Sequence, residues 1–395
     1  MIKLFLKPGR DESVRRFHPW IFSGAIAQTQ GNPAEGDIVA VYTSEGELVA
    51  KGHYQIGSIA VRILSFNGDP CNPDFWKESI AAAYSARVAA GLADNPSTNC
   101  YRLVHGEGDG LPGLIIDWYD GVCVLQAHSV GMFRAKKQIC QALISVFGDR
   151  LKAVYDKSSG TAPFKAGLDL VDGYLYEAES FCKKEQTVLE NANKFIVNWA
   201  EGQKTGFFLD QRDNRALVAQ YAKGRKVLNL FCYTGGFSVY ALAAGAESVT
   251  SVDSSAKAIS LVDRNIELNG LKSHESRCED AIDYLGKTAA GKYDLIIVDP
   301  PAFAKHRGAL KNALRAYQRL NAAAISKVAP GGLVFTFSCS QVVDKISFAE
   351  TVFSAAAKTG RSVRILDRLG QGADHPVNIY HPEGEYLKGL LLYVE

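Results

Sequence analysis

Residues 226–237 read Lys-Val-Leu-Asn-Leu-Phe-Cys-Tyr-Thr-Gly-Gly-Phe, an apolar run that passes through two glycines into a helical pattern. Comparable apolar runs occupy residues 293–299 and 332–338, and helical patterns separate them. Continuously apolar runs are typical of parallel strands that are covered on both faces. Strands that alternate with helices predict a doubly wound sheet, so this part of the chain belongs to the α/β class.

The same rhythm extends on both sides of these runs. Further strands are predicted at 248–253 and 387–394. The predicted helices are 237–246, 254–269, 310–329 and 347–360. Pro330-Gly331-Gly332 is expected to end the third of these helices, because proline and glycine interrupt helical structure.

Two other blocks precede the doubly wound sheet, since 395 residues are too many for one ordinary domain. In residues 1–70, short strand patterns at 37–43, 47–54 and 59–64 predict a small β-barrel or sandwich. Residues 71–190 are expected to form a central α+β module, with the sheet domain at 191–395. The elements predicted in this module are helices 74–91 and 132–147, strands 153–157 and 174–177, and a hairpin over 114–127 that turns at Asp120-Gly121.

Composition excludes several classes of protein. The charges nearly cancel at a net +2, and no apolar run reaches the ~18 residues that a membrane span needs. The first residues, MIKLFLKPGR, do not form a secretory signal. Eight cysteines without a CxxC pair predict neither a disulfide framework nor a zinc site, and we expect no metal. A reducing cytoplasm is the expected location, and a homodimer is one option for the oligomeric state.

A cofactor site is predicted where the sheet strands end. The turn after the first strand, with Phe231, Tyr233, Thr234 and Gly235, lies at the carboxyl edge where open α/β sheets bind ligands. Acidic residues follow the next three strands, namely Asp253, Asp280 and Asp299. We expect Asp253 to bind ribose hydroxyls and Asp280 to lie at an adenine. Stabilisation of a helix N-terminus explains one such acid but not the set.

The order of these parts resembles the S-adenosylmethionine-dependent methyltransferases. The closest resemblance is to the family of large-subunit ribosomal-RNA methyltransferase I, which methylates carbon 5 of a cytidine in 23S rRNA. The motifs that carry it are DQRDNR (210–215), FCYTGGF (231–237), DPPAF (299–303), FSCS (337–340) and ADHPV (373–377). FHPWIF (17–22) is similar to the PUA domain, a small RNA-binding barrel at that family's N-terminus. The resemblance implies S-adenosylmethionine as cofactor, Gln211 and Arg212 in its pocket, and 23S rRNA or an assembly intermediate as partner.

Methylation of cytosine at carbon 5 requires a nucleophile, because that carbon does not attack a methyl sulfonium by itself. A thiolate that adds to carbon 6 makes carbon 5 reactive. Cys339 follows the strand predicted at 332–338, next to the strand that ends at Asp299, so we expect Cys339 as the nucleophile and Asp299 at the cytosine N3/N4 edge. Cys232 is ambiguous because it lies in the cofactor turn. We expect the remaining cysteines to be buried and inert, namely Cys71, Cys100, Cys123, Cys140, Cys182 and Cys278.

Several alternatives stay open. Another branch of cytosine-C5 methyltransferases has a second cysteine where this chain has Pro301, so a mechanism with one cysteine is expected here. The same fold also methylates exocyclic amines, guanine nitrogen or uridine. An RNA-binding protein with an inactive methyltransferase fold is the alternative from another class.

One basic segment is a candidate RNA contact. Residues 301–330 hold six Lys or Arg and no acid, and Lys311, Arg315 and Arg319 recur at every fourth position. Such a stripe attracts phosphates, although a solvated helix face is the simpler interpretation. His105 and His128 are isolated in the sequence, and we expect surface or structural roles for both.

Overall fold

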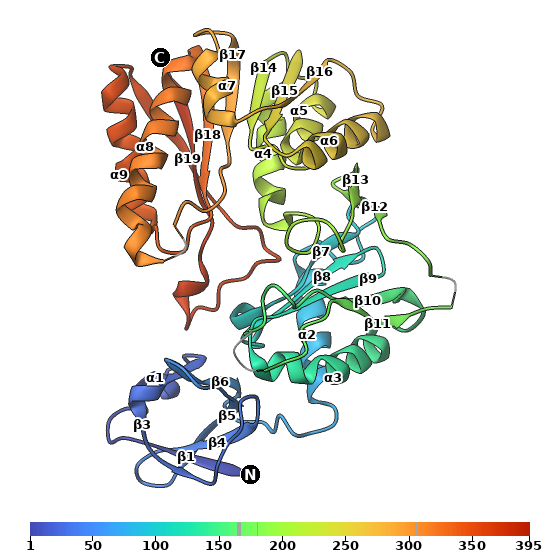
Figure 1. Ribbon diagram of the computed structural model, residues 1–395, viewed down its shortest axis with the longest axis vertical. Helices are drawn as coiled ribbons and strands as arrows, with labels where there is room; N and C mark the ends of the chain where they lie inside the picture. Colours follow the sequence, from blue (N-terminus) through green and yellow to red (C-terminus); the bar gives the residue numbers. More distant parts are fainter. Residues whose placement is uncertain (164–166, 180, 305) are drawn as a thin grey trace. The chain divides into compact units, whose positions relative to one another are not determined.

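The computed structural model describes residues 1–163, 167–179, 181–304 and 306–395 (Figure 1). It divides into two compact units, and the chain passes between them more than once. The first unit comprises Met1–Val188, Val197–Leu209 and Ala373–Gly384, and the second comprises Leu189–Ile196, Asp210–Gly372 and Glu385–Glu395. The expected division at residues 70 and 190 into three domains stays a prediction. None of the helices in the described ranges has the length and apolar character that crossing a membrane would require.

The first unit begins with a six-stranded sheet in the order β2-β6-β5-β4-β1-β3. The strands are β1 (Ile2–Leu6), β2 (Trp20–Phe22), β3 (Ile26–Gln30), β4 (Ile38–Tyr42), β5 (Leu48–Tyr54) and β6 (Ile59–Ser65), with a short helix α1 (Glu12–Arg15). The three predicted strands are present as β4, β5 and β6. A side chain at Gly52 would place its Cβ 2.1 Å from the Arg62 carbonyl oxygen, so the close approach of β5 and β6 requires glycine there.

A five-stranded sheet follows in the order β11-β10-β9-β8-β7. Its strands are β7 (Cys100–His105), β8 (Leu114–Tyr119), β9 (Val122–Ala127), β10 (Ala153–Asp156) and β11 (Gly173–Glu177), and it packs with α2 (Phe75–Ala89) and α3 (Val130–Phe147). Asp120 and Gly121 have φ of 46° and 94°, as a two-residue hairpin turn requires. Each helix and strand predicted in this part of the chain is therefore present, whereas β7 was not predicted.

A two-stranded hairpin, β12 (Gln186–Glu190) and β13 (Asn193–Val197), contributes Leu189–Ile196 to the second unit, after which the chain returns to the first; this hairpin was not predicted. The second unit contains a seven-stranded sheet in the order β16-β15-β14-β17-β18-β20-β19. Its strands are β14 (Lys226–Leu230), β15 (Ser248–Asp253), β16 (His274–Cys278), β17 (Tyr293–Val298), β18 (Val328–Ser338), β19 (Val363–Gly370) and β20 (Lys388–Val394). Strands β14 to β18 run parallel to one another, whereas β20 is antiparallel to β18 and β19.

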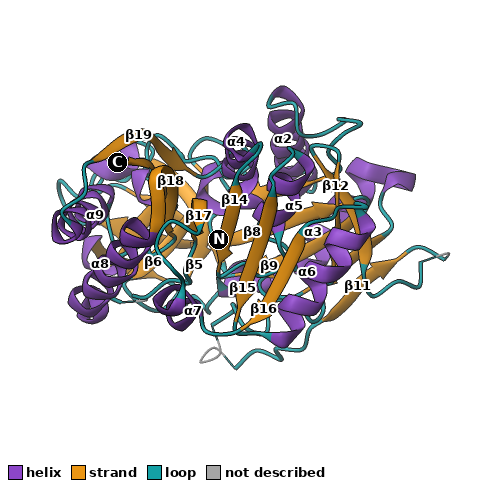
Figure 2. Ribbon diagram, turned by 90° about the horizontal axis from the view of Figure 1, so that it is seen from above, coloured by secondary structure: helices purple, strands orange, loops and turns teal. Residues whose placement is uncertain are grey.

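Helices pack on both faces of this sheet, which confirms the doubly wound α/β prediction. They are α4 (Arg212–Ala222), α5 (Gly236–Ala243), α6 (Ala256–Leu268), α7 (Ala281–Lys287), α8 (Leu310–Lys327) and α9 (Lys345–Thr359). Val334 belongs to the core that α8 and α9 line, and these two helices lie side by side (Figures 1 and 2). The rings of Phe335 and Phe337, from the alternate positions of β18, contact Tyr221 of α4 and Phe237 of α5.

The predicted boundary between α8 and β18 was wrong. Helix α8 ends at Lys327, and Pro330–Gly332 does not end the helix but lies within β18, which begins at Val328. The Arg361 guanidinium donates to the carbonyl oxygens of Ile325 and Val328 at 2.6 and 2.7 Å, so it satisfies carbonyls that the helix end leaves unpaired. Strand pairing then begins at Val328, opposite Tyr293.

Candidate active site

The residues predicted for the site follow strands that end at one edge of the seven-stranded sheet. Leu230 of β14 pairs with Val252 of β15 and with Val298 of β17, and Val298 pairs with Thr336 of β18. In parallel strands these pairings bring the carboxyl ends together. The candidate residues just beyond these pairs are Phe231, Asp253, Asp299 and Cys339.

The turn after β14 has an unusual backbone conformation. Phe231, Tyr233 and Gly235 have φ of 58°, 46° and 76°, a backbone region that residues other than glycine rarely adopt. The Asn265 side chain donates to the Thr234 carbonyl at 2.9 Å and fixes the turn from helix α6. Strain of this kind is typical of functional sites, and here it shapes the predicted cofactor turn.

Asp253 is bound to the same turn. Its carboxylate accepts the backbone N–H of Tyr233 at 3.0 Å and that of Ser255 at 2.9 Å, one on each oxygen. Each carboxylate oxygen has a further lone pair, so an oriented acceptor is left for a pair of hydroxyls.

Asp280 stabilises the N-terminus of a helix, which is the simpler explanation that the sequence allowed for any one of these acids. It is exposed and caps α7, where its Oδ1 accepts the backbone N–H groups of Ile282 and Asp283 at 2.8 and 3.0 Å. Its contact with adenine stays a prediction.

The motif before α4 reaches the site through side chains. Gln211 is buried and donates from Nε2 to Asp299 Oδ2 at 3.0 Å, while its Oε1 accepts from Asn214 at 2.6 Å. Gln211 therefore orients the Asp299 carboxylate. Arg212 is also buried, with Nε 3.5 Å from Glu190 Oε2, so it lies in an ion-pair group behind this contact.

Glu190 anchors that group. Its two carboxylate oxygens accept from Arg215 Nε and Nη2 at 2.8 and 2.7 Å, and Tyr240 donates to it at 3.0 Å. All three side chains are buried. A bidentate pair without exposure to water is rigid, so Glu190 fixes the start of α4 on which the candidate residues lie.

Cys339 is half-buried and lies between two polar neighbours along the sheet edge. Asp299 follows β17 on one side, and Lys388 of β20 pairs with Ser338 on the other. Lys388 is only 5% exposed, and its ammonium donates to the Ser340 and Val343 carbonyls at 2.6 and 2.5 Å. Burial lowers the pKa of Lys388 to about 8, and the nearby Cys339 sulfur opposes that decrease.

Tyr317 of α8 lies beneath the same edge. Its hydroxyl accepts from Ser338 Oγ at 3.0 Å, and it is fully buried. Burial raises the pKa of Tyr317 to about 12, and the charges of Cys339 and Asp299 contribute to the rise, so this phenol stays protonated near neutral pH.

The expectation of buried, inert cysteines holds for only half of the set. Cys100, Cys123 and Cys140 are buried, and burial raises the pKa of Cys123 and Cys140. The expectation was wrong for Cys71, Cys182 and Cys278, which are exposed because they lie in loops and at a strand end of the surface. The ambiguous Cys232 is buried, and burial raises its pKa as well.

The basic stripe, defined as Lys311, Arg315 and Arg319, lies on the exposed face of α8. Ala313, Tyr317 and Leu320 of the same helix are buried, so the stripe faces away from the core. Lys358 of α9 adjoins it through a 3.0 Å bond to Gln318. Lys305, another of the six basic residues in this segment, lies outside the described residues.

Neither His105 nor His128 forms part of this site. His128 is exposed, as expected for a surface residue. His105 is not isolated in space, because its ring lies 5.0 Å from that of His375, which the chain reaches 270 residues later.

Sequence reasoning missed Lys388, Tyr317 and Glu190. A lysine inside the apolar run Leu387–Val394 was the visible signal for Lys388, because a charged residue in a buried strand needs a reason. Tyr317 and Glu190 gave no such signal, since their partners are distant in the sequence.

Comparisons with known proteins give the family. The model of S-adenosylmethionine-dependent methyltransferases matches residues 101–391, and that of PUA-like domains matches residues 4–66. The chain is 42% identical to a protein named ribosomal RNA large subunit methyltransferase I from Pseudoalteromonas atlantica over 400 residues, covering 99% of each chain. It is 39% identical to the protein of the same name from Aeromonas hydrophila, covering 98% of each.

Solved structures agree on the fold. The SMU.776 methyltransferase, determined with SAH bound, superposes with a TM-score of 0.85 at 24% identity and full coverage of both chains. A protein described as an S-adenosylmethionine-dependent methyltransferase from Streptococcus mutans gives a TM-score of 0.83 at 23% identity, again with full coverage.

Proposed function

The chain belongs to the ribosomal RNA large subunit methyltransferase I family of S-adenosylmethionine-dependent methyltransferases, and we propose that it methylates carbon 5 of a cytidine in 23S rRNA. S-adenosylmethionine supplies the methyl group as an electrophilic carbon on a sulfonium. The substrate is the rRNA or a particle assembled on it, and the reaction takes place in the cytoplasm.

The residues at the sheet edge fit this cofactor. Asp253 presents an oriented carboxylate to a ribose diol, and the turn Phe231–Gly235 exposes backbone at the end of β14. Asp280 is assigned to the adenine, with its Oδ2 available beside the capping Oδ1. Gln211, Arg212, Tyr233 and Thr234 complete the proposed pocket. Asp299 is assigned to both the pocket and the target base.

The placement of Cys339 is the observation that supports carbon 5 as the target. A half-buried thiol follows β18, Asp299 follows the neighbouring β17, and a buried ammonium lies on β20. Methylation of an amine or a ring nitrogen needs no thiol, whereas carbon 5 does.

In the proposed reaction, the Cys339 thiolate adds to carbon 6 of the cytosine. Asp299, held by Gln211, bonds the N3/N4 edge and stabilises the ring while carbon 5 becomes enamine-like. After methylation of carbon 5, its proton passes to a water molecule, and expulsion of the thiolate restores the aromatic ring. The chain has Pro301 where a second cysteine would assist release, so one cysteine performs both addition and departure.

We infer that Lys388 is a positioning residue for this thiolate. Its ammonium donates to the carbonyl of Ser340, the residue next to Cys339, and interacts electrostatically with the thiol. A nearby cation lowers the pKa of a thiol and increases the thiolate fraction near neutral pH.

RNA recognition is assigned to the PUA-like domain and to the basic stripe. The stripe is exposed, carries one sign of charge and follows the Asp299 motif along the chain. Its contact with RNA phosphates is part of the proposal, and the charge pattern supports it.

The test of the proposal uses RNA that contains 5-fluorocytidine, in which fluorine cannot leave as a proton does. The wild-type chain and the control Cys278→Ala should form a covalent RNA complex, whereas Cys339→Ala should form none and lose turnover by orders of magnitude. Nucleoside mass spectrometry identifies the product. Full methylation by Cys339→Ala, or a methylated guanosine or uridine as product, would contradict the proposal.

A further inference from the structure

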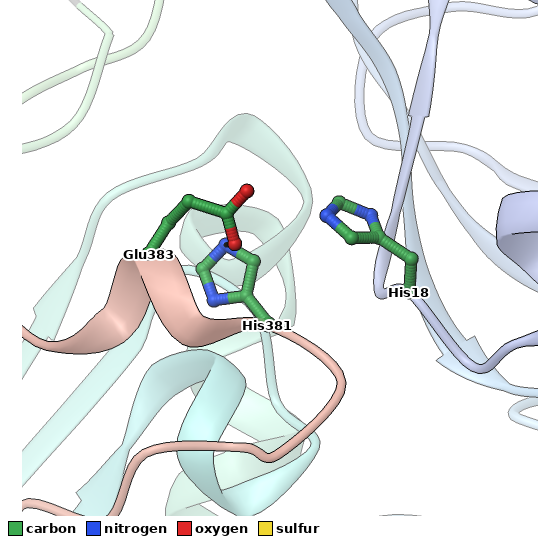
Figure 3. A group of neighbouring side chains, drawn as sticks. All are labelled: His18, His381 and Glu383. Carbon is green, nitrogen blue, oxygen red and sulfur yellow. Dashed lines mark ion pairs between the residues drawn. The ribbon is translucent and has the colours of Figure 1, made fainter.

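A second cluster of polar side chains lies in the first unit. Among the described residues, His18, His381 and Glu383 form the only group of three or more His, Cys, Asp or Glu whose ligand atoms come close enough to share a metal ion. One atom from each side chain lies within 4.8 Å of the others, and Figure 3 shows the Glu383 carboxylate pointing toward the His18 ring, with the His381 ring beside Glu383. His18 lies between α1 and β2 in the part of the chain that contains strands β1 to β6, here called the N-terminal β domain. His381 and Glu383 belong to segment 373–384.

His381 gives an independent reason to expect a ligand. Its side chain is 4% exposed, and neither ring nitrogen has a hydrogen-bond partner. Trp20 occupies one side of the ring, with centroids 4.3 Å apart, and cannot satisfy the nitrogens. Glu383 Oε2 is 3.9 Å from Nε2, beyond hydrogen-bond distance. A buried imidazole without a partner is unfavourable, so a bound species is a natural explanation.

We propose that His18, His381 and Glu383 bind one divalent transition-metal ion of the Zn²⁺ type. Two imidazoles and one carboxylate are a ligand set that Zn²⁺ uses, with a fourth position left for water.

The surroundings of His18 fit the same role. Its Nδ1 lies 3.2 Å from both the backbone N–H and the carbonyl oxygen of Trp20, so it accepts from the N–H in one tautomer and donates to the carbonyl in the other. Metal binding through Nε2 selects the tautomer in which Nδ1–H donates to the carbonyl. A histidine ligand commonly donates its other ring N–H to a carbonyl in this way. Trp20 is itself held by Glu107, which accepts its indole N–H at 2.9 Å.

The ligand atoms must approach one another when the ion binds. Bonds of ~2.1 Å in a tetrahedral site place ligand atoms about 3.4 Å apart, which is less than the 4.8 Å limit of the cluster. Glu383 can make this adjustment because its side chain is 60% exposed, whereas His381 is fixed by its burial. The ion would therefore fasten segment 373–384 to the N-terminal β domain.

The experiment measures Zn²⁺ binding to the full chain. Since Cys71, Cys182 and Cys278 are exposed thiols that bind zinc by themselves, all variants carry serine at these three positions. The chain is treated with a chelator, and ZnCl₂ is titrated in competition with a chromophoric chelator. CoCl₂ then reports the coordination geometry by its visible absorption. The test variants are His18→Gln and Glu383→Gln, and the controls are His306→Gln and Glu350→Gln, which change exposed residues elsewhere.

We expect one Zn²⁺ per chain, a tetrahedral Co²⁺ spectrum, and at least a tenfold weaker affinity in both test variants but in neither control. Zinc should also raise the melting temperature of the parent chain more than that of Glu383→Gln. Circular dichroism of the metal-free variants checks that they are folded. Absence of stoichiometric binding to the parent chain, or affinity unchanged by either test substitution in a folded variant, would overturn the proposal.

Discussion

Replacing Lys388 with glutamine should raise the pKa of the Cys339 thiol. The amide can still donate to the Ser340 and Val343 carbonyls, which the ammonium contacts at 2.6 and 2.5 Å, but it carries no charge. With a pKa of about 8, Lys388 is mostly protonated at pH 7. An opposite charge within a few ångströms shifts a pKa by ~1–3 units, so we expect a rise of at least about one unit, or ~1.4 kcal/mol.

The assay follows alkylation of Cys339 by iodoacetamide as a function of pH, with the modified peptide quantified by mass spectrometry. At pH 7 the thiolate fraction, and with it the alkylation rate, should fall about tenfold in Lys388→Gln. Methyl transfer should fall by a similar factor and recover partly at pH 9. Lys157→Gln is the matched control, because Lys157 also donates to two backbone carbonyls, those of Trp199 and Gly202. Superimposable pH profiles of Cys339 in the wild type and Lys388→Gln would refute the inference.

Because of the same lysine, the free energy of unfolding should increase with pH. Its folded pKa of about 8 lies below the ordinary 10.5, so between these values the unfolded chain binds more protons. The free energy of unfolding should therefore rise by up to ~3 kcal/mol as pH increases from about 8 to about 10.5. Below pH 8 the cost of burying the charged lysine should be fully present. In Lys388→Met this rise should be absent from urea unfolding measured across the same range. A rise of equal size in the variant would assign it to other groups.

Three further predictions concern the cofactor, the RNA and the core. Asp253→Ala should weaken S-adenosylmethionine binding by ~1.5–3 kcal/mol in calorimetry, because charge-assisted hydrogen bonds are lost; unchanged affinity would reject the ribose assignment. Reversing the three charges of the basic stripe should weaken RNA binding and reduce the slope of log affinity against log salt, and an unaltered slope would argue for a solvated face. Glu190→Gln should lower the free energy of unfolding by ~3–5 kcal/mol, because it leaves the buried Arg215 without its charged partner. A loss below ~1 kcal/mol in urea unfolding would show that the pair is dispensable.

The sequence predicted those parts of the fold whose signals are local. Strands β14, β17 and β18 are buried on both faces and therefore read as apolar runs. The hairpin at Asp120-Gly121 depends on two residues whose backbone suits the turn. Such patterns can be recognised because neighbours in the chain determine them.

Elements that depend on distant partners were missed. Strand β1 pairs in parallel with β4 and antiparallel with β3, which no local pattern shows. The end of α8 was misplaced because Arg361, 34 residues beyond Lys327, caps its carbonyls. At these positions tertiary contacts outweigh the local propensity for helix or strand.

The candidate site likewise contains residues that the sequence alone could identify and residues that it could not. Residues that directly follow strands, such as Asp253, Asp299 and Cys339, could be named from the sequence because the carboxyl ends of parallel strands meet at one edge. Lys388 is visible in the sequence as a lysine within an apolar run, but its link to Cys339 is not, because that link depends on the antiparallel pairing of β20 with β18. The contact of Gln211 with Asp299 joins residues 88 positions apart and likewise appears only in the folded chain.

Lys157 and Lys388 together separate a structural role from a positioning role. Each donates to two backbone carbonyls, and burial lowers the pKa of each. Two carbonyls alone require only neutral donors, so the hydrogen bonds do not explain a charge in either case. The charged group that most opposes the decrease is the Asp172 carboxylate for Lys157 but the Cys339 thiol for Lys388. Cys339 raises the pKa of Lys388 more than the carboxylates of Asp344 and Glu385 do. A thiol interacts with a cation in this way only when it ionises, and this is the state that attack on carbon 6 requires.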